Sequence, residues 1–182
     1  MKQSERGYTV VEVIIAVTII IFIVGAATMT TFQVFNATRN SNKHMTVVSQ
    51  VQNAGYWISH DALMADGIVI DDEPGTEEFL TLTWAEWDFD EIEDTIYHSV
   101  TYSIQDLSSG IGKFVRTYSD GEVEEQTLVA EYIYYNPYYN PENPGDATWA
   151  TYTYPVLTMQ IAASFEDASE IREYEIWLRR DF

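Results

Sequence analysis

The chain has 182 residues, 46% of them apolar, and a formal net charge of −20 at pH 7. It is long enough for one domain with an appended segment, and its apolar content is sufficient for a core. The sequence contains no cysteine, which excludes a disulfide framework, a thiolate metal site and a cysteine nucleophile.

The charge is distributed very unevenly along the chain. Residues 66–182 hold 26 acidic and five basic residues, a net charge of −21, whereas residues 1–65 are nearly balanced. A surface this negative repels nucleic acids and anionic membranes, so no nucleic acid partner is expected. It favours solubility, and it also attracts cations and basic partners.

The first predicted element is one long helix over residues 8–65, because no proline precedes Pro74 and glycines are few. Residues 8–35 are the membrane-spanning or filament-core half, apolar on all sides apart from Glu12, Gln33 and a few threonines. Residues 36–66 are the amphipathic half. Its apolar stripe has spacings of three and four and consists of Val47, Val51, Ala54, Ile58, Ala62 and Ala65.

After Gly67 the apolar residues recur with a period of two, which is typical of strands. Strands are expected in residues 79–84, 96–104, 155–165 and 170–180, with a hairpin in 113–135 around Asp120-Gly121. One face of each strand is apolar, so we expect a mostly antiparallel sheet with one buried face, covered by the helix stripe. The sequence therefore predicts an α+β fold, with residues 67–182 forming an acidic, β-rich head.

The apolar N-terminal segment fits three interpretations, and Glu12 distinguishes between them. A secretory signal peptide would have Lys2 and Arg6 as its charged region, and a plain membrane anchor would need only the apolar length. Neither accounts for a carboxylate in the run, which costs about 2.5–3.5 kcal/mol at the centre of a spanning helix and less near the interface.

The third interpretation uses the stretch RGYTVVEVIIAVTIII after the short basic leader MKQSERG. This stretch resembles the class III signal of type IV pilins and pseudopilins, in which glycine, an aromatic residue and a glutamate stand in fixed register. The resemblance implies that residues 1–7 are a cytoplasmic leader cleaved between Gly7 and Tyr8 by a prepilin peptidase. It also implies that Tyr8 is N-methylated and that Glu12 pairs with the terminal amine of a neighbouring subunit. Tyrosine in place of the commoner phenylalanine, and the absence of a proline near residue 29, depart from the family pattern.

The same resemblance implies a pilin fold and a structural function rather than catalysis. The chain would be a single-pass protein of the cytoplasmic membrane, with Lys2 and Arg6 inside and the head outside. It would polymerise through its helix into a type IV pilus or a type II secretion or competence pseudopilus. The expected partners are other pilin subunits, the membrane, the prepilin peptidase and the assembly platform.

The head is similar, more loosely, to J-type minor pseudopilins and PilW-like minor pilins. The stretches that carry this similarity are VQNAGYWISHDALMADG at the helix end, YSIQD, GKFVRTYSDGE and QTLVAEYI in the middle of the head, and YPVLTMQIAASFED and YEIWLRR towards the C-terminus. The similarity favours a minor subunit over a major one. A membrane-anchored module whose acidic head binds cations or a basic ligand is the alternative function.

Two head segments offer further candidate sites. The stretch WDFDEIED contains Asp88, Asp90, Glu91, Glu93 and Asp94. We favour a solvated acidic loop there, with a calcium site as the alternative; no other cofactor is expected. The tyrosine-rich stretch YIYYNPYYN favours a strand and a proline-rich loop, with a contact surface at Tyr138 and Tyr139 as the alternative.

The histidines, His44, His60 and His98, suggest no catalytic or zinc site. We expect His98 to be packed or hydrogen-bonded, because it is in line with apolar strand positions. His60 and Asp61 are adjacent on a helix, so they are not expected to face each other.

Overall fold

The computed structural model describes residues 8–70, 78–87, 95–136 and 145–178. The chain divides into two compact units, residues 1–42 and residues 43–182. Helix α1 (Val10–Ala62) makes up the described part of the first unit from residue 10 onward and continues into the second. Its start and end agree with the predicted helix to within three residues.

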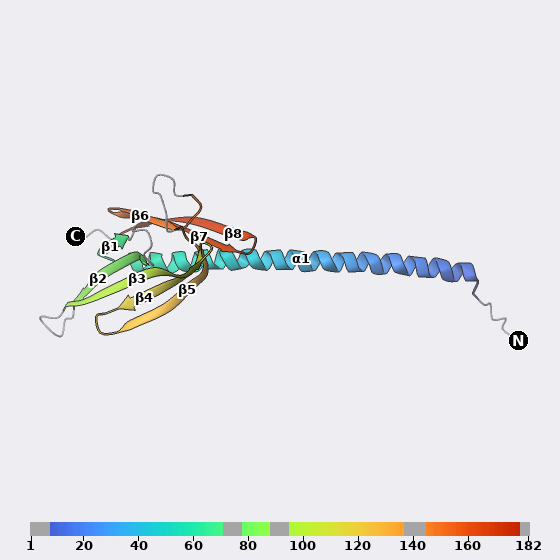
Figure 1. The fold of residues 1–182 in the computed structure, drawn as a ribbon, viewed down its shortest axis with the longest axis horizontal. Coiled ribbons are helices and arrows are strands. Elements are labelled where there is room, and N and C mark those ends of the chain that lie inside the picture. Colours follow the sequence, from blue (N-terminus) through green and yellow to red (C-terminus); the bar gives the residue numbers. More distant parts are fainter. Residues whose placement is uncertain (1–7, 71–77, 88–94, 137–144, 179–182) are drawn as a thin grey trace. The chain divides into compact units, whose positions relative to one another are not determined.

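The strands of the described residues all belong to the second unit and form one antiparallel sheet (Figure 1). They are β1 (Gly67–Ile70), β2 (Glu78–Trp87), β3 (Thr95–Ser108), β4 (Ile111–Ser119), β5 (Glu124–Tyr134), β6 (Trp149–Thr153), β7 (Val156–Phe165) and β8 (Ala168–Trp177). Strands β1 to β5 form a meander, and β6 and β8 both pair with β7. A single residue pair, Ile133 with Ala163, joins β5 to β7, so the sheet has two parts.

The helical residues from 43 to 62 lie between these two parts of the sheet (Figure 1). Asn53 of α1 donates a side-chain hydrogen bond of 2.7 Å to the carbonyl of Val129 in β5. On the other side, the hydroxyl of Tyr174 in β8 donates to the carbonyl of Val51 at 3.2 Å. The sheet thus curls around the helix, and both of its parts are tied to the helix by hydrogen bonds.

The predicted apolar stripe of α1 is the centre of the core, which confirms the α+β fold class. Val47, Val51, Ala54, Ile58 and Ala62 are fully buried, and Ala65 nearly so. They pack against the inward-facing residues of the strands, including Leu80, Leu82, Val100, Tyr102, Phe114, Leu157, Met159 and Ile161. In β3, and in β2 from Leu80 onward, the core residues alternate with outward-facing ones, as a pleated sheet covered on one face requires, whereas β7 buries the consecutive residues Ile161, Ala162 and Ala163.

Gly55 marks the closest approach of the helix to the sheet. A Cβ atom at this position would lie 2.2 Å from the ring carbon Cζ of Tyr174. No real Cβ makes so short a contact, so a side chain on residue 55 would displace the ring. Glycine is therefore required here by the packing of Tyr174.

The sequence-based predictions of strands and of the helix end differ from the structure in three respects. Strands β1 and β6 were not predicted, because four or five residues are too few to establish a period-two pattern. In the expected strand 96–104 the period-two pattern puts Ile96 on the same face as Val100, Tyr102 and Ile104, but Ile96 is exposed near the start of β3. The predicted helix 8–65 also ends earlier than expected: α1 stops at Ala62, the chain turns there, and Leu63 is exposed.

Candidate functional site: the apolar N-terminal segment and the head

The apolar half of α1 exposes all of its large side chains. From Tyr8 to Phe35 the least exposed of the large apolar residues, Val17, still has 48% of its surface accessible. Among the described residues, α1 is the one helix long and apolar enough to cross a membrane. Soluble monomers rarely expose so extensive an apolar surface, and by its length and composition this segment could span a membrane.

The threonine side chains of residues 10–31 are hydrogen-bonded within the helix itself. The hydroxyl of Thr18 donates to the carbonyl of Ile14 at 2.8 Å. Three later threonines also donate to the carbonyl four residues earlier, namely Thr28, Thr30 and Thr31. Residues 10–31 span about 33 Å at 1.5 Å per residue, which matches a hydrocarbon core of about 30 Å. The segment can therefore enter an apolar environment without leaving these hydroxyls unpaired.

Glu12 has a partner within its own chain. Its Oε2 atom accepts the backbone N–H and the hydroxyl of Thr9, both at 3.1 Å, and the hydroxyl of Thr9 accepts the N–H of Glu12 at 3.3 Å. This is a capping box, in which the residue before the helix and the third helical residue satisfy each other's backbone donors. The Thr9-x-x-Glu12 spacing by itself predicts this box, and the interpretation of Glu12 given above lacked this intramolecular partner.

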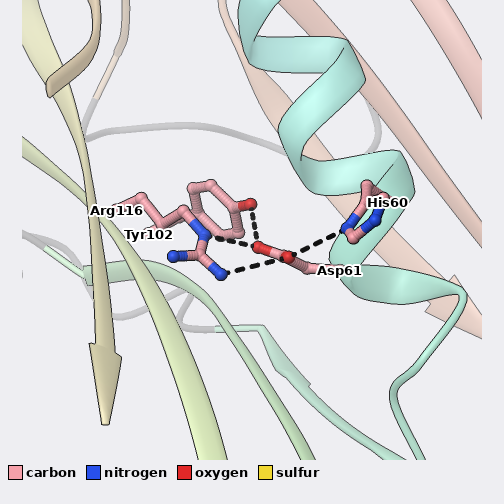
Figure 2. Close-up of polar contacts among 4 residues, drawn as sticks. All are labelled: His60, Asp61, Tyr102 and Arg116. Atoms are coloured by element: carbon pink, nitrogen blue, oxygen red, sulfur yellow. Dashed lines mark hydrogen bonds and ion pairs between the residues drawn. The ribbon is translucent and has the colours of Figure 1, made fainter. Parts of the chain in front are cut away.

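A buried ion pair closes the other end of α1 (Figure 2). Asp61 is only 1% exposed, and its carboxylate accepts two hydrogen bonds from Arg116 of β4, 2.7 Å from Nε and 3.2 Å from Nη2. The hydroxyl of Tyr102 in β3 also donates to it, at 2.5 Å. Three elements that are far apart in sequence are thus joined at a single carboxylate.

The Asp61 cluster consists of Asp61, Tyr102, Arg116 and Trp57, and its contacts hold these side chains in fixed positions. Burial, together with the negative charge of Asp61 and its hydrogen bond, raises the pKa of the Tyr102 hydroxyl far above its usual range. The hydroxyl is therefore held protonated, as a donor. The guanidinium of Arg116 also lies over the Trp57 ring, 5.0 Å from its centroid. Every group in the cluster is held by several neighbours, which fixes the end of the helix against the sheet.

His60 approaches Asp61 more closely than the sequence suggested. Its Nδ1 atom lies 3.5 Å from the Asp61 carboxylate, as Figure 2 shows. The expectation that these adjacent residues would not meet was wrong. Both lie in the last turn of α1, where the ring of His60 can lean towards the buried carboxylate.

His98 is packed and hydrogen-bonded, as predicted. It is stacked on Trp84 of β2, and its ring nitrogens lie 2.8 Å from the Tyr118 hydroxyl and 3.2 Å from a Glu86 oxygen. Within the residues that the structure describes, no group of three or more histidine or acidic side chains is arranged to hold a metal ion.

Acidic residues outnumber basic residues in the head, and the described lysines and arginines of the second unit already form ion pairs with carboxylates. Lys43 lies 2.7 Å from Glu166 and 2.5 Å from Asp167, and these contacts raise the pKa of its ammonium group. Lys113 pairs with Asp106, and Arg172 with Glu170. Together with Arg116, these are all the described lysines and arginines of the second unit. The surplus charge that the head presents to a partner is therefore negative.

Several predicted site residues lie outside the described part of the chain. They are Gly7 of the expected cleavage site, the calcium candidates Asp88, Asp90, Glu91, Glu93 and Asp94, and the contact candidates Tyr138 and Tyr139. Of the predicted assembly residues, Tyr8 and Glu12 are described: Tyr8 is exposed just before the helix, and Glu12 lies in its first turn.

Comparison with protein-family models, with curated proteins and with solved structures found no match to this chain. The long apolar helix and the antiparallel sheet packed on its second half are compatible with a pilin-like fold.

Proposed function

We propose that the protein is a structural subunit, and a minor one, of a type IV pilus or of a type II secretion or competence pseudopilus. A prepilin peptidase cleaves it after Gly7, and the mature chain begins with N-methylated Tyr8. It is stored in the cytoplasmic membrane with its N-terminus inside and its head outside. An assembly platform then moves it into a fibre, where its apolar helix packs against those of other subunits.

The observation that carries this proposal is the form of the N-terminal segment. Its large apolar side chains are all exposed, and its threonine hydroxyls donate to backbone carbonyls of the same helix. A glutamate lies in its first turn. Such a segment suits lipid before assembly and a bundle of apolar helices afterwards. The Gly-Tyr-x-x-x-Glu register then gives the site of processing.

The capping box explains how Glu12 is accommodated before assembly. Cleavage after Gly7 leaves the backbone N–H and the hydroxyl of Thr9 in place, so the carboxylate keeps both contacts in the stored subunit. In the fibre, a neighbouring terminal amine about 4 Å away would contribute on the order of 4 kcal/mol at an effective dielectric constant near 20. Glu12 would thereby fix the axial register between subunits.

Variants of the segment test this proposal when expressed with a prepilin peptidase and an assembly platform. Glu12→Ala should be processed and remain in the membrane, with at least tenfold less protein in sheared fibres. Thr18→Val removes a polar group from the same segment without touching the charge, and should assemble normally. Normal fibre incorporation of Glu12→Ala would overturn the assigned role of Glu12.

The surplus of acidic groups on the head favours a second candidate function. A membrane-anchored module could use this surface to bind cations or a basic ligand. Such a module would be anchored by the same segment but would need neither cleavage after Gly7 nor fibre formation. Processing at Tyr8 therefore separates the two functions.

A further inference from the structure

The head has an open cavity of about 440 Å³ that lies outside the apolar segment and the ion pair of Asp61, and Trp84 and His98, described above, are among its lining residues. Its lining includes Asp66, Thr83, Ala85, Tyr97, Ser99 and Ser119. Leu82 and Val100 point into the core, so their neighbours Thr83 and Ser99 point to the opposite, solvent-facing side of the sheet. The cavity is therefore a trough on the outer face of β2, β3 and β4.

A row of three hydroxyl groups crosses this trough. Thr83 of β2 pairs in register with Ser99 of β3, and Ser99 pairs with Ser119 of β4. Neighbouring strands lie about 4.8 Å apart, so the row spans about 10 Å, the length of a disaccharide. Each hydroxyl can both donate and accept hydrogen bonds, which suits it to partners that are themselves hydroxyls.

An aromatic ring and a carboxylate border the row. Tyr97 is 72% exposed, and its register partner Ala85 is too small to cover it, so the ring is open to a ligand. Asp66 immediately precedes β1, and its Oδ2 atom accepts a hydrogen bond of 3.4 Å from the backbone N–H of Ala85. This bond holds the Asp66 carboxylate at the edge of the row. Carboxylate oxygens accept hydrogen bonds strongly, and the negative face of an aromatic ring attracts partly positive C–H groups.

We infer that this trough binds a neutral saccharide. A sugar ring offers an apolar C–H face for Tyr97 and hydroxyls for the Thr83–Ser99–Ser119 row and for Asp66. Anionic ligands are disfavoured, because the described basic groups of the head are engaged in ion pairs and the head is strongly negative. The volume lies within the range of about 300–1,000 Å³ that is usual for small-molecule sites.

This inference does not depend on polymerisation, since every residue in it belongs to the second unit and none to the apolar segment. The test uses the full-length chain in a detergent without a sugar headgroup. Maltohexaose, cellohexaose and the hexamer of N-acetylglucosamine are titrated by calorimetry and by amide NMR. Acidic sialyllactose and the cationic hexamer of glucosamine serve as comparison ligands.

At least one neutral oligosaccharide should bind saturably with a Kd of about 1 mM or tighter. Its chemical-shift changes should centre on Thr83, Ser99 and Ser119. Tyr97→Ala and Asp66→Asn should each weaken binding at least tenfold. Tyr56→Ala, which removes a similarly exposed tyrosine from α1, should leave the affinity unchanged.

Three results would overturn the inference. The first is that none of the neutral oligosaccharides binds. The second is that Tyr97→Ala retains full affinity while its thermal melt matches that of the parent chain. The third is that only the glucosamine hexamer or sialyllactose binds, since this would make charge rather than hydroxyl recognition the basis of the site.

Discussion

Removal of the Asp61 carboxylate should destabilise the head more than any surface change. In Asp61→Ala, the Arg116 side chain, only 13% exposed, loses its counter-charge, and the Tyr102 hydroxyl loses its acceptor. Breaking a buried ion pair from one side costs about 3–5 kcal/mol. Most domains have an unfolding free energy of only about 5–15 kcal/mol, so this loss is a large part of the total.

Urea unfolding of the full-length chain, followed by tryptophan fluorescence, measures this loss. With an m-value of about 2 kcal/mol/M, a cost of about 4 kcal/mol lowers the midpoint by about 2 M. Lys113→Ala removes an exposed ion pair and should shift the urea midpoint far less than Asp61→Ala does. The double variant Asp61→Leu/Arg116→Met leaves no unpaired charge, so it should be more stable than Asp61→Ala alone.

Two results would refute this reasoning. A midpoint shift below about 0.5 M for Asp61→Ala would mean that the carboxylate is not the buried link between α1 and the sheet. If the loss of unfolding free energy in the double variant equals the sum of the losses in Asp61→Leu and Arg116→Met, Asp61 and Arg116 act independently.

Three further predictions follow from the contacts. Folding raises the pKa of Tyr102, so the stability that this hydroxyl contributes is complete below about pH 10. Above that pH the unfolded chain releases the proton, and the contribution falls by about 1.4 kcal/mol per pH unit. Urea midpoints between pH 9 and 11.5 should therefore fall less steeply in Tyr102→Phe than in the parent chain, and parallel slopes would contradict this. Gly55→Ala should lower the melting temperature, because the clash with Tyr174 outweighs the helix propensity gained. Gly25→Ala, which has open space around its Cβ position, should not lower the melting temperature. Equal effects of the two changes would be evidence against the clash. Thr9→Val should cost the first turn of α1 about 1 kcal/mol, seen as faster amide exchange there than in Thr18→Val, and unchanged exchange would rule out the capping box.

The sequence was informative wherever the physics is local. The stripe from Val47 to Ala65 identified the buried face of α1, and the period-two pattern placed most strands. The capping box was also local and legible, in Thr9-x-x-Glu12.

The Asp61 cluster needed information that no local pattern contains. Asp61 stands three residues after Ile58 and four before Ala65, on the stripe itself, and Arg116 alternates with Phe114 and Tyr118 on the buried face of β4. Both positions signalled charges in the core. Pairing them required the order of the strands and the position of the helix between them, which depend on contacts between distant residues. The single link between β5 and β7 and the hydroxyl row of the trough are of the same non-local kind.

Intact-mass and N-terminal peptide mass spectrometry of the protein from its native membrane tests the central claim most directly. The proposed function predicts a mature chain that begins at Tyr8 and carries a methyl group on its terminal amine. A chain that begins at Met1 would contradict it, and so would one cut close to Ala27, where the small residues Gly25-Ala26-Ala27 would end a secretory signal peptide.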